Sequence, residues 1–311
     1  MQVIIILVGV LLLLTVLHLI GYMIYKLYEN ETRKIKPYGK LVQTSNGKMH
    51  LYDLGKENEN TIVILPGLGD ALPCADFGPL MRDLSKEYHV VCVEYLGVGF
   101  SDPTDKPRTN EAYVSEIREA LRAFGCTPPY ILMPHSCSGI YCEYYAAKYP
   151  DEISHMIELD CTSTALSQSP ASPNWVYSLS RFMQTCGVTR LTNTLMKPMQ
   201  QIKYGYTAKE QKDYLIFSYH AITPALKNQN KEIFSCIKEV QTLPYPDSIP
   251  TLKLISGQAV SAFGDGYQTK HMNRLGDNAK KSLVYGSVHM MHQKHHETIA
   301  EEVTNFINEN N

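Results

Sequence analysis

The chain begins with its longest apolar stretch. Residues Val3 to Tyr25 include no Asp, Glu, Lys or Arg. At ~1.5 Å of rise per residue, a helix of this length crosses the hydrocarbon core of a bilayer. Tyr22, Tyr25 and Tyr28 stand where an interfacial belt of aromatic side chains would lie. The pattern therefore predicts a membrane-spanning helix over residues 1–27.

The charges that flank this stretch predict its orientation. No basic residue precedes it, and four follow it closely: Lys26, Arg33, Lys34 and Lys36. Because cytoplasmic flanks carry the excess of Lys and Arg, the body of the protein is expected on the cytoplasmic side of the cell membrane. A cleaved signal peptide is the alternative. It is disfavoured because its basic N-terminal region and a small-x-small cleavage site are both missing.

After a polar linker over residues 28–39, short apolar runs alternate with helical patterns. The expected strands cover residues 40–44, 48–54, 61–65, 89–93, 130–133, 153–159, 251–256 and 282–285. Asn46-Gly47 is a strong hairpin turn that joins the first two strands. Helical spacing occurs over residues 75–85, 109–124, 140–148 and from about 290 to 307. This alternation predicts an α/β fold, with a mainly parallel sheet and helices on both faces.

One segment interrupts the alternation. Residues 163–173 are rich in Ser, Ala and Pro, and residues 175–240 have helical spacing with many aromatic and Met side chains. Such side chains usually form core, but a helical insertion above the strand ends also makes a cap over a pocket. We therefore predict a core formed by residues 40–162 and 249–311, with a helical cap inserted at 163–248.

The candidate chemistry centres on Ser136. The run Tyr130 to Met133 predicts a buried strand, a polar turn around Ser136 follows, and a helix begins near Ile140. Strand, sharp turn with serine, and helix together form a nucleophile elbow. Pro134 and Ser138 occupy the positions where glycines are usual. Ser138 is a rival nucleophile, but it would lie inside the helix.

A serine hydroxyl needs a base, and the base needs a carboxylate to orient it. In a parallel sheet, ligands bind beyond the carboxyl ends of the strands. Gly67, Glu94, Ser136, Asp160 and His289 all stand at such ends. Cys137, next to the serine, is a weaker candidate nucleophile because its side chain would point away.

Four segments in this order resemble the α/β-hydrolase family. They are Leu65 to Leu68, Glu94 to Asp102, Pro134 to Gly139, and Gly286 to His289. The resemblance extends from about Leu41 to the C-terminus. It implies that Ser136 is the nucleophile and His289 the general base. It also implies that the backbone N–H groups of Leu68 and Cys137 form the oxyanion hole.

The acid of the triad departs from the family pattern. Most members carry it in the loop after the strand at 251–256, but Val260 occupies that place here. Asp160 and Asp265 are the two candidates. Asp265 would need a loop that curls back, whereas Asp160 ends the strand after the elbow, a position that some family members use. We therefore favour Asp160.

Composition narrows the function further. The formal net charge is -2, and no basic run with interleaved aromatics suggests nucleic-acid binding. Gly97-Val98-Gly99 lacks the third glycine of a dinucleotide site. The 8 cysteines form no C-x-x-C pair, which is typical of buried, reduced thiols. His292, His295 and His296 could suggest a metal with His289, but their spacing fits a solvated helix face better. We expect neither cofactor nor metal.

The resemblance implies a serine hydrolase that cleaves a carboxylic ester through an acyl-enzyme, and the N-terminal apolar stretch predicts that it is anchored in the membrane. A small to medium apolar ester is the expected substrate, because the insertion is rich in apolar and aromatic residues. Peptidase, lipase, thioesterase and acyltransferase activities would use the same site. A catalytically inactive hydrolase-fold protein that binds a ligand at the membrane is the alternative from another class, because no carboxylate stands at the usual place after Ser256.

Overall fold

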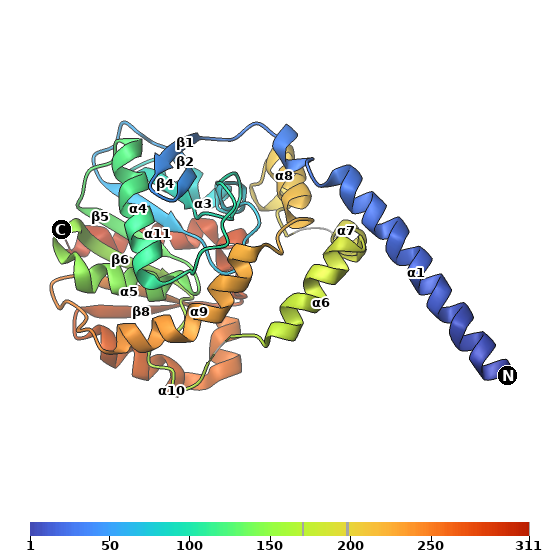
Figure 1. Ribbon diagram of the computed structural model, residues 1–311. Coiled ribbons are helices and arrows are strands. Elements are labelled where there is room, and N and C mark those ends of the chain that lie inside the picture. The colour runs from blue at the N-terminus through green and yellow to red at the C-terminus, as the bar shows by residue number, and fades with distance from the viewer. Residues whose placement is uncertain (170, 197–198, 311) are drawn as a thin grey trace.

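The computed structural model describes residues 1–169, 171–196 and 199–310, and for residues 263–267 it describes the backbone alone. A twisted sheet forms the centre of the molecule, helices cover both of its faces, and the N-terminal helix α1 (Gln2–Tyr28) projects away from the body (Figure 1). The predicted α/β class is therefore correct.

The sheet has eight strands in the spatial order β1-β2-β4-β3-β5-β6-β7-β8. Their bounds are Lys40–Thr44 (β1), Gly47–Leu54 (β2), Thr61–Leu65 (β3), His89–Glu94 (β4), Tyr130–Pro134 (β5), Ile153–Leu159 (β6), Thr251–Ser256 (β7) and Ala279–Val284 (β8). The pairs β1–β2 and β2–β4 are antiparallel and all other pairs are parallel. The sheet is mainly parallel, as predicted, so most strands deliver their carboxyl ends to one edge.

Alternating side chains build a core on each face of the sheet. Val63 and Leu65 face a cluster formed with α4 (Asn110–Phe124) and α5 (Ser138–Lys148). Ile62 and Ile64 face the opposite cluster, formed with α3 (Gly78–Leu84) and α11 (His296–Asn310). All four side chains are fully buried. This continuous apolar run is what a strand covered on both faces requires.

The helix predicted over residues 75–85 is instead two helices. A short α2 (Pro73–Asp76) ends at Phe77, and α3 begins directly afterwards. Pro79 lies in the first turn of α3. Proline has no backbone N–H, so it cannot donate to the carbonyl four residues back and continue the first helix. The apolar spacing persists across the break, which explains why the pattern suggested a single element.

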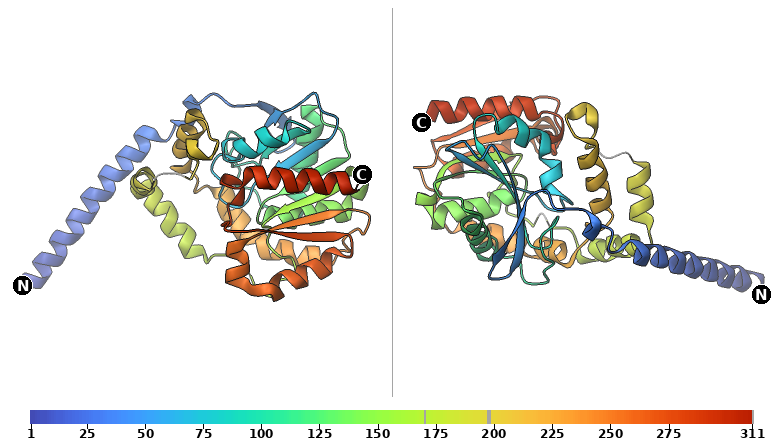
Figure 2. Two further views of the ribbon diagram at one scale, coloured as in Figure 1. Left: turned by 180° about the vertical axis from the view of Figure 1, so that it is seen from behind. Right: turned by 90° about the horizontal axis from the view of Figure 1, so that it is seen from above.

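Helices fill the insertion between β6 and β7. They are α6 (Asn174–Thr185), α7 (Val188–Leu195), the short η3 (Ile202–Tyr204), α8 (Ala208–Ser218) and α9 (Pro224–Gln241). Threonine side chains cap two of them: Thr207 forms a capping box with Glu210, and Thr223 accepts from the N–H of Leu226. α6 and α7 lie on the side of the body from which α1 projects (Figure 2).

Within the described residues, one helix, near the N-terminus, is long and apolar enough to cross a membrane by length and composition. Much of α1 projects from the body, but its C-terminal turns pack against the insertion (Figure 1). Gly21 marks the closest approach. A Cβ atom added there would lie 2.0 Å from the carbonyl oxygen of Cys186, so a larger residue would push α1 away from α6.

The prediction of a loop over residues 257–265 is wrong, because the helix α10 (Gly257–Leu275) begins directly after β7. The side chain of Ser256 accepts a hydrogen bond from the N–H of Ala259 at 3.0 Å. This N-cap starts a helix where the family pattern suggested a loop. Asp265 therefore lies within a helix, and its side chain falls outside the described residues.

A buried ion pair fastens α4 to the loop before it. Two guanidinium nitrogens of Arg108 donate to the two carboxylate oxygens of Glu116 at 3.0 and 2.8 Å. Neither side chain is more than 1% exposed. Asn46, in the β1–β2 hairpin, donates to the same carboxylate at 3.0 Å. The pair thus links α4 and the loop before it to a hairpin that lies 70 residues from Glu116 in the sequence.

Replacing Glu116 with alanine would leave the buried Arg108 guanidinium without its counter-ion. We expect the free energy of unfolding to fall by about 3–5 kcal/mol, the usual cost of breaking a buried pair. Lys280→Ala removes an exposed pair with Glu309 and should cost less than about 1 kcal/mol. Denaturant unfolding in detergent measures both. Equal losses in the two variants would contradict this account.

Candidate active site

Ser136 lies at the sharp turn between β5 and α5. Its φ is +57°, a left-handed conformation that is uncommon for a residue with a side chain and costs of order 1–3 kcal/mol. Its backbone N–H donates to Leu159 at 3.1 Å, and its carbonyl accepts from Thr162 at 3.0 Å. Contacts with the end of β6 and the start of the insertion thus hold the strained turn in place.

Close packing around the turn explains two nearby glycines. A Cβ atom on Gly67 would lie 2.8 Å from Nδ1 of His135 and 2.9 Å from Cβ of Ser136. A Cβ atom on Gly139 would lie 2.7 Å from Cβ of Cys161. The loop after β3 and the first turn of α5 can therefore approach the serine only because these positions carry no side chain.

The structure brings together the three residues predicted as a triad. Nε2 of His289 lies 2.9 Å from the Ser136 hydroxyl, and its Nδ1 lies 2.7 Å from a carboxylate oxygen of Asp160. The serine follows β5, the aspartate follows β6 and the histidine follows β8. Residues 24 and 129 positions apart thus meet at one edge of the sheet, because parallel neighbours end there.

The carboxylate of Asp160 is held by Ser256. The backbone N–H of Ser256 donates to one of its oxygens and the Ser256 hydroxyl to the other, both at 2.8 Å. Burial raises the pKa of Asp160, but the hydrogen bonds from His289 and Ser256 outweigh it and hold the pKa below its usual value. An ionised carboxylate at this distance keeps the Nδ1 proton on His289, which leaves Nε2 able to accept the serine proton.

The backbone of His289 is also fixed. Its N–H donates to the side-chain oxygen of Gln258 at 2.9 Å, and its carbonyl accepts from Nε2 of His135 at 3.1 Å. His135 is buried, and burial lowers its pKa to about 3. A neutral imidazole thus supports the loop that carries the catalytic candidate.

Ser256, Gln258 and His135 were not predicted as site residues. The sequence could have indicated Ser256, since it ends β7 beside the strand that is followed by Asp160. No feature of the sequence indicates Gln258 or His135, because both side chains contact the backbone of His289, more than thirty residues away in the sequence.

The two backbone groups predicted for the oxyanion hole lie on adjoining segments. Among the hydrogen bonds of the described loops and turns, the N–H groups of Leu68 and Cys137 donate to no backbone carbonyl. The hydroxyl of Ser138 donates to the carbonyl of Pro66 and lies 2.8 Å from the hydroxyl of Tyr95. This contact ties the Leu68 loop to α5, so the two segments that carry these N–H groups are held together.

The two rival nucleophiles are buried. Ser138 is fully buried and its hydroxyl is engaged by Pro66 and Tyr95. The Cys137 thiol lies 3.4 Å from the side-chain nitrogen of Gln229, and burial raises its pKa to about 12. A neutral, enclosed thiol is a poor nucleophile.

One cavity is lined by the serine, and a second lies beside the Leu68 loop. One of about 600 Å³ contains the side chains of Ser136 and His289 and is walled by the start of the insertion and by α10, including Leu166, Ala259 and Ala262. The other, of about 480 Å³, is lined by Gly69 beside the Leu68 loop, by Gln229 on α9, and by Tyr25 of α1. Each has the volume of a small-molecule site.

The prediction that His292, His295 and His296 share a solvated helix face is wrong. His292 is fully buried, its Nε2 lies 2.6 Å from Asp76, and its ring stacks on Phe77. It belongs to a 3₁₀ turn, η4 (Met291–Gln293), whereas α11 begins only at His296. The change of helix type places the three side chains in different environments.

Two buried groups in the described chain have the composition of metal sites. In the first, of His50, Cys74 and Glu94, both nitrogens of His50 are engaged: Nε2 accepts from the N–H of Gly39 and Nδ1 contacts Glu94. In the second, of Glu143, Glu158 and His271, the Lys253 ammonium lies 2.7 Å from Glu158. In the first group the Glu94 carboxylate is held by hydrogen-bond donors, which include the N–H groups of Cys74 and Phe100, and in the second the ammonium already supplies the charge that a cation would bring.

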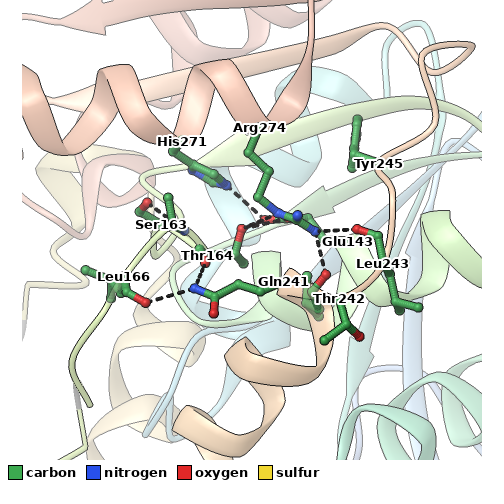
Figure 3. Close-up of polar contacts among 12 residues, drawn as sticks. Glu143, Ser163, Thr164, Leu166, Gln241, Thr242, Leu243, Tyr245, His271 and Arg274 are labelled. Carbon is green, nitrogen blue, oxygen red and sulfur yellow. Dashed lines mark hydrogen bonds and ion pairs between the residues drawn. The ribbon is translucent and has the colours of Figure 1, made fainter.

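The second group fastens the insertion to the core (Figure 3). The Glu143 carboxylate, on α5, bonds to His271, Arg274 and Thr164 at 2.8–2.9 Å. Arg274 also donates to the carbonyl of Val240 at 2.7 Å. Burial raises the pKa of Glu143, but these partners outweigh it and lower the pKa overall. Both ends of the insertion are thereby held to the elbow helix.

Several comparisons match this fold and site. A family model described as alpha/beta hydrolase fold matches residues 60–305. A Bacillus subtilis protein named uncharacterized protein YbdG is 37% identical over 42% of this chain and 40% of its own length. A Bos taurus protein named (lyso)-N-acylphosphatidylethanolamine lipase is 30% identical over 32% of each chain. This chain thus matches less than half the length of these relatives.

Among solved structures, a bacterial membrane phospholipase A superposes with a TM-score of 0.63 over 98% of both chains, at 18% identity. Similarity at that identity supports the fold, with the N-terminal helix included in the aligned length. The family match covers most of the chain and all of the residues that surround Ser136. We therefore conclude that the protein belongs to the alpha/beta hydrolase fold family.

Proposed function

We propose that this protein is a membrane-anchored serine hydrolase that cleaves carboxylic esters through an acyl-enzyme. The observation that carries the proposal is the unbroken chain from the Ser136 hydroxyl through His289 to Asp160, with contacts of 2.9 and 2.7 Å. A serine, an imidazole and an ionised carboxylate in this order form the arrangement that activates a hydroxyl for attack on a carbonyl.

In the proposed reaction, Ser136 attacks the ester carbonyl while Nε2 of His289 takes the hydroxyl proton. The N–H groups of Leu68 and Cys137 stabilise the negative charge on the former carbonyl oxygen. His289 then gives its proton to the leaving alcohol as the carbon–oxygen bond breaks. Water, deprotonated by His289, attacks the acyl-enzyme and releases the acid, and the proton returns to Ser136.

The surroundings of the site support an apolar ester of small to medium size. The cavity at Ser136 is walled by Leu166, Ala259 and Ala262. The helices of residues 163–248 are inserted in the sequence between β6 and β7. In this proposal they act as a cap over the site. The lipase and phospholipase names of similar proteins are consistent with a lipid-like substrate.

We further propose that α1 anchors the protein in the cell membrane as a single span, with the catalytic body in the cytoplasm. The supporting observations are the uncharged stretch up to Tyr25 and the basic residues that follow it. The geometry favours this enzyme over an inactive binding protein, because the carboxylate that seemed missing after Ser256 has a counterpart in Asp160.

A fluorophosphonate probe tests the nucleophile. The wild-type protein should be labelled, because activated serine hydroxyls react with such probes, and Ser136→Ala should abolish labelling. Gel fluorescence measures the incorporated probe. Ser138→Ala, two residues away, tests the rival nucleophile and should still be labelled, but more slowly because its hydroxyl holds the Leu68 loop. Folded wild-type protein that takes up no probe would refute the enzyme.

The role of Asp160 is tested by Asp160→Asn. The amide cannot hold the imidazole in the required tautomer, so turnover of a soluble ester should fall by roughly 10³–10⁴-fold. Ester hydrolysis at neutral pH measures the change. Asp265→Asn is the control and should retain turnover. The opposite pattern would transfer the acid role to Asp265.

Asp160 should also influence stability in acid. Its folded pKa lies below its ordinary value, so its carboxylate stabilises the fold above about pH 4, and that contribution disappears as pH falls through the folded pKa. The difference in unfolding free energy between wild type and Asp160→Asn should therefore grow as pH rises through the folded pKa and stay level above about pH 5. A difference that does not change with pH would contradict the assigned pKa shift.

A further inference from the structure

The insertion exposes an apolar stripe. On α6, Trp175, Leu179 and Phe182 follow at helical spacing and are 66%, 48% and 53% exposed. On α7, Leu191 and Leu195 are 60% and 71% exposed. Large apolar side chains that cluster on adjoining helices and are exposed to solvent indicate an interaction site. We call these five residues the α6–α7 stripe.

The stripe is continuous with the apolar surface of α1. The ring of Phe182 stacks on His18 with centroids 5.2 Å apart, and Nδ1 of His18 lies 2.9 Å from the sulfur of Cys186. At ~1.5 Å per residue, His18 lies about 10 Å before Tyr25, where the uncharged stretch ends. If α1 spans a bilayer, Phe182 and Cys186, near the junction of α6 and α7, thus lie about 10 Å inside its apolar boundary, within the depth that interfacial helices reach.

The charge of this region suits an anionic lipid surface. Residues 163–209 contain no Asp or Glu and carry five basic residues: Arg181, Arg190, Lys197, Lys203 and Lys209. Two of these lie at the interfacial level of α1, with Arg181 over the ring of Tyr25 and Arg190 over that of Tyr28. Cationic helices with an apolar stripe bind in the plane of a bilayer interface.

The cavity of about 480 Å³ extends from this level toward Gln229 on α9. Tyr25, Glu29 and Arg181 line it on the side of α1 and the insertion. Gly69 and Gln229 line it on the side of the oxyanion loop, where Gln229 also contacts Cys137. An acyl chain that leaves the bilayer beside α1 and enters this cavity would therefore reach Gln229, which contacts the residue next to Ser136.

We propose that α6 and α7 lie in the membrane interface and that the substrate is an acyl lipid resident in the membrane, admitted through this cavity. The inference rests on the proposed function, because it uses α1 as a membrane span and Ser136 as the nucleophile. The bilayer is favoured over a second copy of the chain as the occupant, since the stripe adjoins α1 and residues 163–209 carry basic but no acidic side chains.

Trp175 provides a direct test, because it is the only tryptophan of the chain. The full-length protein is reconstituted in vesicles of phosphatidylcholine and phosphatidylglycerol, with and without brominated phosphatidylcholine. Brominated lipid should quench Trp175 fluorescence. Acrylamide should quench Trp175 less in the vesicles than it quenches a tryptophan peptide that is free in solution. Fluorescence that acrylamide quenches fully and brominated lipid does not would overturn the proposal. So would protection that depends on protein concentration, which marks a second copy as the occupant.

Activity gives a second readout. The triple variant Leu179→Ser, Leu191→Ser, Leu195→Ser should hydrolyse an acyl glycerolipid in vesicles about tenfold more slowly, since the apolar anchor is lost. Its rate on a water-soluble short-chain ester should be unchanged. The matched control is Leu41→Ser, on β1 and 45% exposed, which should alter neither rate.

The two proposals fail in different ways. Equal loss on both substrates, or no loss on either, would overturn the interfacial role of the stripe. Absence of turnover on both substrates in wild type, together with no fluorophosphonate labelling, would instead refute the hydrolase. Quenching of Trp175 by brominated lipid would still report on the stripe in that case, because it requires no catalysis.

Discussion

The buried carboxylate of Asp160 is the constraint around which the site is arranged. It ends β6, lies beside the end of β7, and accepts two hydrogen bonds from Ser256 and one from His289. A buried charge is tolerated only where donors surround it. The same donors that stabilise the charge also fix its direction, so the imidazole is presented to Ser136 by the sheet itself. No long loop is required.

This arrangement explains why α10 follows β7 without a loop. Ser256 acts twice, since its hydroxyl contacts Asp160 and also caps α10 through Ala259. Where the acid stands after β6, the segment after β7 is free to form a helix that walls the cavity. Gln258 in its first turn then holds the backbone of His289. Moving one carboxylate to the neighbouring strand thus changes the role of a whole segment.

A second polar cluster governs the insertion. Glu143 lies on the elbow helix, and through Arg274 and Thr164 it joins the two ends of residues 163–248 to α5 and α10. The outer part of the insertion makes its contacts with α1 instead, through Phe182 and Cys186. The helices of the insertion are therefore attached to the nucleophile's helix at one end and to the apolar N-terminal helix at the other. In the proposed function, these two attachments are the physical basis for coupling the site to a membrane.

The sequence by itself determined the elements that depend on local pattern. The uncharged run up to Tyr25, the Asn46-Gly47 hairpin and the strand–serine–helix unit at Ser136 each follow from spacing, turn chemistry or composition over a short window. The order of strands and helices then places Ser136, Asp160 and His289 at one edge, because parallel strands end together. That was enough to favour Asp160 before any geometry was known.

Tertiary structure alone decided everything that depends on partners distant in the sequence. The support of His289 by His135 and Gln258, the burial of His292 against Asp76, and the contact of α1 with α6 involve side chains 31 to 216 positions apart. Local spacing carries no information about such contacts, which is why His292 was expected on a solvated face. The helix α10 was not predicted for the same reason. Its start depends on the N-cap Ser256, which also contacts Asp160 at the end of the neighbouring strand.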